Sequence, residues 1–182
     1  MRNATASKLL LILCAALLFV SGAGAQTPPP PPPQLAPVPP ALLNAKTIFI
    51  SNAGADSGLF PHPFSGDPDR PYNAFYAAIQ SWGRYQIVGD PSEADLVFEL
   101  HLVAPNGPSS PSKQNGASDP LPMFRLAIFD RKTHYVLWTL TESIGFAILQ
   151  KTHDNNFDIA LTAIAMDLKR VTSAPASTAA NH

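Results

Sequence analysis

The chain almost lacks cysteine. Cys14 is the only one among 182 residues, and it lies inside an apolar run near the amino terminus. Once that run is removed no thiol remains, so disulfide bonds and thiolate chemistry are excluded for the rest of the chain. The fold beyond this segment must therefore be held together by its hydrophobic core.

A basic stripe is also missing. The 12 lysine and arginine residues are outnumbered by 13 aspartate and glutamate residues, and the basic residues are not clustered. Proteins that bind nucleic acid usually carry such a cluster, because most of their affinity comes from contacts with phosphates. The composition therefore predicts no nucleic-acid partner, and the length suits one domain.

Signatures of catalysis and metal binding are absent too. The five histidines never occur at His-x-x-x-His spacing, and there is no Gly-x-Ser-x-Gly nucleophile elbow. The glycine-containing segment 52–58 follows a predicted strand, but it lacks the Gly-x-Gly-x-x-Gly spacing and the lysine of a phosphate loop. We therefore expect no catalytic residue, no cofactor-binding residue and no metal ligand.

The first 25 residues, in contrast, form a recognisable pattern. Arg2 and Lys8 give a positive start, residues 9–20 are continuously apolar, and residues 21–25 are small. This order is typical of a secretory signal peptide, and the apolar run is short for a bilayer span. We expect cleavage near Ala25 and a periplasmic or secreted protein.

An uncleaved leader that anchors the protein is the alternative. A lipoprotein is disfavoured, because Cys14 lies in the middle of the apolar run without small residues before it. Cleavage after Ala25 would remove two basic residues and leave 157 residues with ten basic and 13 acidic side chains, a formal charge of −3.

Residues 26–43 are predicted to be a proline-rich linker. Nine of the fourteen residues from Thr27 to Pro40 are proline. Proline lacks the amide donor and has a fixed φ angle, so this segment suits an extended polyproline II spacer of about 3.1 Å per residue, or a disordered leader.

Residues 44–173 contain the periodic segments of a folded domain, and residues 174–182 are predicted to be a disordered tail. The predicted elements are a strand at 46–50, a helix at 71–82, strands at 85–88 and 96–103, a hairpin at 123–129 and 134–141, and a closing helix. We expect Asn155 or Asn156 to cap that helix, with Asp158 in its first turn. Segments 51–70 and 104–122 are predicted to be long loops, and 143–151 prolongs a strand or covers the sheet edge.

This order of elements predicts an α+β fold. We expect a two-layer sandwich, in which a mostly antiparallel sheet of about five strands carries two helices on one face. In the strand at 96–103, apolar residues alternate with Glu99 and His101, so one face is buried and the other is partly wet. Phe49 and Phe129 are expected on the wetter face.

Two sequence segments resemble those of a known group of proteins. Glu93-Ala94-Asp95-Leu96-Val97-Phe98 and the segment 126–138 resemble small bacterial envelope proteins of unknown function. Their α+β module is similar to the amino-terminal domain of the Tol–Pal translocation protein and to the curli-secretion lipoprotein. The resemblance covers residues 46–172 and implies assembly and interaction roles, with no catalytic residues to transfer. The lipidated cysteine of the lipoprotein members is missing here.

The preferred functional hypothesis is an exported, non-enzymatic envelope protein that acts as an interaction or assembly module on a proline-rich spacer. Long irregular loops in a compact domain are often functional. In the loop at 51–70 we expect Phe60, His62 and Phe64 to contact a partner. The second face of the sheet is the other candidate surface. The expected partner is an envelope protein or a cell-wall component, and a sheet edge offers a route to a homo-oligomer.

The alternative is a small periplasmic hydrolase or metal-dependent enzyme that uses His134, Asp130 and His153. It requires these three side chains to lie in one cleft within hydrogen-bond reach. Glu99 and His101 form a further polar pair that could hold a metal with one more ligand, although solvent exposure is the simpler interpretation.

Overall fold

The computed structural model describes residues 37–107 and 119–173. The predicted leader at 1–25, most of the predicted linker at 26–43 and the predicted tail at 174–182 lie outside these ranges. The described elements are α2 (Pro40–Asn44), β1 (Thr47–Ala55), α3 (Arg70–Trp82), β2 (Gln86–Ile87), a 3₁₀ turn η1 (Pro91–Glu93), β3 (Leu96–Val103), β4 (Met123–Asp130), β5 (Val136–Ser143) and α4 (Gln150–Ser173). Within the described ranges no helix is long and apolar enough to cross a membrane.

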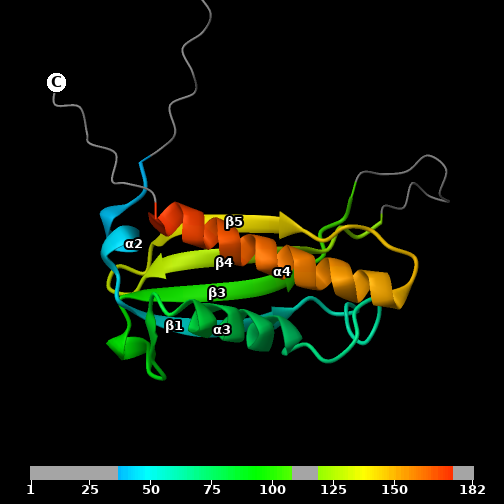
Figure 1. The fold of residues 1–182 in the computed structure, drawn as a ribbon, viewed down its shortest axis with the longest axis horizontal. Helices are drawn as coiled ribbons and strands as arrows, with labels where there is room; N and C mark the ends of the chain where they lie inside the picture. Colours follow the sequence, from blue (N-terminus) through cyan, green and yellow to red (C-terminus); the bar gives the residue numbers. More distant parts are fainter. Residues whose placement is uncertain (1–36, 108–118, 174–182) are drawn as a thin grey trace, which may run out of the picture. The chain divides into compact units, whose positions relative to one another are not determined.

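The five strands form one open sheet in the order β2-β1-β3-β4-β5 (Figure 1). β1 pairs in parallel with β2 and with β3, whereas β3–β4 and β4–β5 are antiparallel. The sheet is therefore mixed, with two parallel and two antiparallel pairings. The predicted α+β class and the number of strands are confirmed.

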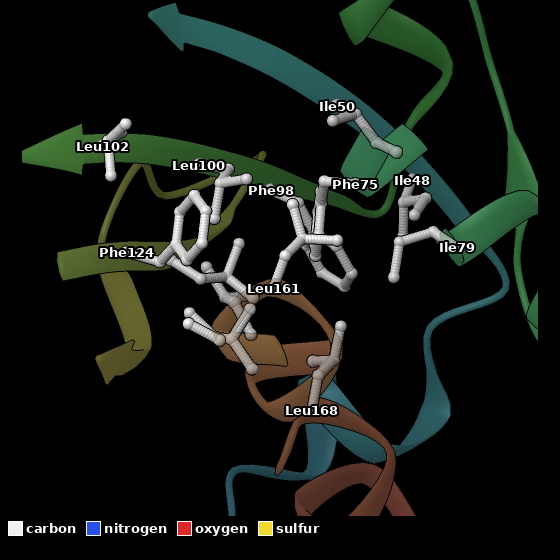
Figure 2. Packing of buried hydrophobic residues seen from close by; sticks show 14 of the residues in the cluster. Ile48, Ile50, Phe75, Ile79, Phe98, Leu100, Leu102, Phe124, Leu161 and Leu168 are labelled. Atoms are coloured by element: carbon white, nitrogen blue, oxygen red, sulfur yellow. The ribbon is translucent and has the colours of Figure 1, made fainter. Parts of the chain in front are cut away.

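Helices α3 and α4 cover one face of the sheet and contact each other (Figure 1). Figure 2 shows Ile79 of α3 and Leu161 and Leu168 of α4 pointing toward the inward side chains of the strands. The apolar stripe along α4 is buried, with Phe157, Ile164 and Leu168 all 0% exposed. The two-layer arrangement follows from these two amphipathic faces packing on one apolar sheet face.

The alternation predicted for the strand at 96–103 is present in β3. Its residues alternate strictly between buried and half-buried along all eight positions. Leu96, Phe98, Leu100 and Leu102 enter the core, so Glu99 and His101 lie on the open face as expected. α3 also ends as predicted, at Trp82, and the next residue, Gly83, has a φ of 69°, the left-handed conformation that glycine adopts without a steric cost.

Several element boundaries differ from expectation, among them that of β5, which runs over Val136–Ser143 rather than 134–141. β1 continues to Ala55 rather than ending at Ile50, because one extra residue between Asn52 and Ala55 forms a bulge at which Gly54 has a φ of 71°. The first loop therefore occupies 56–69 rather than 51–70. The folded part also begins before Asn44, since Leu42 of α2 is completely buried in the core.

The predicted cap of the closing helix is wrong. α4 begins at Gln150, so Asn155 and Asn156 are inside it and Asp158 is beyond its first turn. The Asn156 side chain instead donates to the carbonyl oxygen of Gly145 at 2.9 Å. This bond fixes the connection that leads from β5 into the helix.

Candidate functional site

The long connections of the domain gather at one end of the sheet, which we call the loop end. The carboxyl ends of β1, β3 and β5 all lie there because β1 and β3 are parallel and β4 reverses the chain. Figure 1 shows the connections 56–69 and 144–149, with the described residues 104–107 and 119–122, on this side of the molecule. Residues 108–118 of the connection 104–122 lie outside the described residues.

The connection 56–69 is anchored in the core. Leu59 is 3% exposed and Phe64 is 0% exposed. The Phe64 ring packs against Phe60 at 6.1 Å and against Phe157 of α4 at 5.5 Å between centroids. Of the three residues proposed for partner contact, Phe64 is therefore a core residue, Phe60 is half-buried and His62 is exposed.

Polar bonds tie the same connection to α4. Arg70 Nη1 lies 2.5 Å from Asp154 Oδ1 and donates to the carbonyl oxygen of Ser65 at 3.0 Å. Burial alone would raise the pKa of Asp154, but hydrogen bonds from the Ser65 N–H and from Arg70 outweigh it and lower that pKa. Arg70 also lies over the Phe157 ring at 4.2 Å. The loop is thus a fixed part of the structure.

The exposed apolar residues of the loop end come from another segment. Phe146, Ile148 and Leu149 are 86%, 88% and 68% exposed. We call these three residues the apolar tip. Leu121, two residues before β4, adds a fourth large apolar side chain at this end, 48% exposed. Isolated exposed apolar residues are ordinary, but a contiguous group marks a contact surface.

The apolar tip is held in position by its neighbours. Ile144 and Ala147 point inward and are 7% and 8% exposed. Asn156 donates to Gly145, and Gln150 Nε2 donates to the carbonyl oxygen of Pro61 at 3.1 Å. The Leu149 carbonyl oxygen also accepts from the Thr152 and His153 N–H groups, so the backbone is fixed on both sides of the tip while its side chains stay in water.

Sequence reasoning missed this surface, because segment 143–151 was ambiguous. A usable signal was present: residues 145–149 read Gly-Phe-Ala-Ile-Leu, an apolar run without strand alternation or helical spacing. An apolar run that follows neither period cannot direct all its side chains to one core.

The open face of the sheet is the second surface. Phe49, Val97 and Phe129 form a row across β1, β3 and β4, as their register shows, and all three are half-buried. His101 Nε2 lies 3.3 Å from Asp56 Oδ1. No group of three potential metal ligands occurs among the described residues.

Of the proposed enzyme residues, Asp130 and His134 share one turn, in which the His134 N–H donates to the Asp130 carbonyl oxygen at 2.8 Å, but His153 lies apart. Asp130 ends β4 opposite Leu96, whereas Phe124, six residues earlier in β4, packs on Phe157 near His153 at the loop end. Six strand residues span about 20 Å. Asp130 accepts hydrogen bonds from the Thr133 and Lys132 backbone N–H groups, which lower its pKa and bind it to its own turn. Asp130, His134 and His153 therefore do not form one cleft.

No family model matches the chain, and no curated protein matches it. Several solved structures are similar in part. A DUF4136 family protein from Bacteroides thetaiotaomicron is 14% identical with a TM-score of 0.46, covering 72% of this chain and 91% of its own. A DUF330 protein from Xanthomonas campestris is 14% identical with a TM-score of 0.45, covering 76% and 89%.

A PelC dodecamer from Paraburkholderia phytofirmans is 13% identical with a TM-score of 0.41, covering 71% of this chain and 88% of its own. Among the similar structures are proteins of uncharacterised families and bacterial lipoproteins. At these TM-scores the likenesses carry no inference about activity. The resemblance to the Tol–Pal and curli proteins stays a prediction.

Proposed function

We propose that this chain is an exported, non-enzymatic interaction module of the bacterial cell envelope, presented on a proline-rich spacer. The leader pattern of residues 1–25 supports export, and the proline-rich segment supports a domain held at a distance from its point of attachment. The folded domain then offers a fixed surface for a partner.

The apolar tip carries the proposal. Three large apolar side chains, each at least 68% exposed, stand on a backbone held from both sides by hydrogen bonds. An exposed apolar group on a fixed backbone loses little conformational entropy when a partner covers it. Function, rather than folding, accounts for leaving this surface in water.

The chemistry of the tip favours an apolar protein surface as the occupant. The ionisable Asp154 near it is paired with Arg70, Gln150 is bonded to the Pro61 carbonyl, and the exposed Lys151 adds one positive charge beside the tip. Binding to polyanionic polymers or to anionic lipid head groups depends on clusters of basic residues, which one lysine does not supply. The partner we propose is therefore an envelope protein that presents an apolar patch.

A triple variant tests this proposal: Phe146→Ser, Ile148→Ser and Leu149→Ser. The matched control is Ile159→Ser with Met166→Ser, because these α4 residues are 59% and 56% exposed but lie away from the tip. We expect the tip variant to lose a discrete envelope complex, seen after mild extraction and native electrophoresis, while the control keeps it. The proposal fails if the tip variant, folded by circular dichroism, retains the complex.

A further inference from the structure

The two edges of the sheet are built differently. β2 closes one edge with two residues and is followed by the η1 turn. β5 closes the other with eight residues and has no further strand beside it in the described part of the chain. Short edges resist pairing with another chain, whereas a long edge presents a row of free backbone donors and acceptors.

β5 lacks the residues that usually protect such an edge. Its sequence, Val-Leu-Trp-Thr-Leu-Thr-Glu-Ser, contains no proline and no lysine or arginine. A bulge at Leu137 disturbs only its start, since the register with β4 is regular from Trp138 to Ser143. Six consecutive residues therefore offer a regular edge.

The side chains of β5 are also incompletely covered. β3 buries every second residue, but no residue of β5 is buried. Trp138 and Leu140 point toward the helix-covered face, opposite Ile128 and Leu126, yet both stay half-exposed. Another strand beside β5 would extend the sheet and cover this rim of the core.

We propose that β5 is a homodimer interface, where the β5 strands of two copies pair antiparallel about a two-fold axis at Leu140. In this register Leu140 lies opposite the Leu140 of a second copy, and Thr139 lies opposite Thr141. Trp138 lies opposite Glu142, so the single charge of the strand meets no like charge. Apolar pairs and threonine pairs directly opposite each other stabilise antiparallel strands.

A second copy suits this edge because the strand is complementary to itself. The two-fold axis keeps inward residues opposite inward residues, so the two helix layers lie on the same side of one continuous ten-stranded sheet. The small formal net charge, −1 for the whole chain and −3 after cleavage at Ala25, adds little repulsion between copies. This inference does not depend on the apolar tip.

Cysteine pairing tests the register, in a Cys14→Ser background that has no other cysteine. Directly opposite Cα atoms lie about 4.5–5.5 Å apart, within disulfide range, whereas diagonal positions lie about 7–8 Å apart and outside it. We expect mixed Thr139→Cys and Thr141→Cys chains to form a disulfide on mild oxidation, and each variant alone to form none. Failure of the mixed pair to cross-link would overturn the register.

Charge on the edge tests the interface itself. We expect the exported wild-type chain to have the mass of two copies by light scattering across a concentration series. Thr139→Lys with Thr141→Lys places like charges opposite each other and should give the mass of one copy. Asn73→Lys with Gln80→Lys, at exposed positions of α3, adds the same charge and should leave two copies.

Three results would overturn the proposal: a wild-type chain that stays single, a dimer that survives the β5 lysines, or cysteine variants whose only adduct is a different protein. The third would assign the edge to a foreign strand. Circular dichroism of each variant separates loss of pairing from loss of folding.

Discussion

The burial of Phe64 predicts that the connection 56–69 is part of the folding core. Phe64→Ala would empty a site that is 0% exposed and remove ring contacts with Phe60, Phe157 and His153. Phenylalanine-to-alanine changes in cores cost about 3–5 kcal/mol, and aromatic pairs contribute about 0.5–1.5 kcal/mol beyond their buried area. We expect the free energy of unfolding to fall by about 4 kcal/mol.

Urea denaturation followed by tryptophan fluorescence measures this change. The matched control is His62→Ala, two residues away and exposed, for which we expect a change within about 0.5 kcal/mol. A loss below about 1 kcal/mol for Phe64→Ala, with an unchanged denaturant slope, would refute the reasoning, because the loop would then be separable from the core.

Two further predictions concern charged groups. Arg70→Met removes the contacts with Asp154 and Asp158. The Arg70 and Asp154 side chains are 22% and 23% exposed, so we expect the free energy of unfolding to fall by about 1–2 kcal/mol, more than for an exposed ion pair and less than for a buried one. Arg170→Met is the control: it breaks the pair with Asp167, in which the Arg170 side chain is 77% exposed, and should change the free energy of unfolding by less than about 0.5 kcal/mol. Equal losses for the two variants would contradict the prediction. Hydrogen bonds from the Lys46 and Thr47 backbone N–H groups lower the pKa of Asp95 from 3.8, so its stabilising contribution is present above that pH and is lost as the pH falls through the lower, folded-state value. As the pH is lowered below 3.8, the urea concentration at the midpoint of unfolding should therefore decrease, and it should decrease less steeply for Asp95→Asn than for the wild type. A midpoint concentration that increases over this pH range would contradict the assignment.

Much of the fold could be predicted because its signals are local. Strict alternation identified β3, and helical spacing ended by Gly83 identified α3. β1 was predicted too short because Gly54 in a strand pattern reads as a loop, whereas here it forms a bulge within the ladder. The start of α4 was misplaced because Asn155 and Asn156 have capping side chains, while the actual start follows from contacts made by the preceding connection.

The candidate site was harder to predict, because exposure is a tertiary property. Phe60 and Phe64 lie in an irregular segment, and local sequence does not say whether such rings face solvent or a helix. The Phe64 ring faces helix α4, because its centroid lies 5.5 Å from that of the Phe157 ring. Ile148 is the opposite case, because this apolar residue is 88% exposed. Its exposure follows from the positions of its neighbours, since Ala147 points inward and Gln150 is bonded to the Pro61 carbonyl.

The measurement that tests the central claim most directly is site-specific photo-cross-linking in intact cells. A photoreactive residue replaces Ile148 of the apolar tip in one strain and Ile159 of α4 in another. We predict one discrete adduct with an envelope protein from position 148 and none from position 159. Equal labelling from both positions, or no adduct from position 148, would contradict the account.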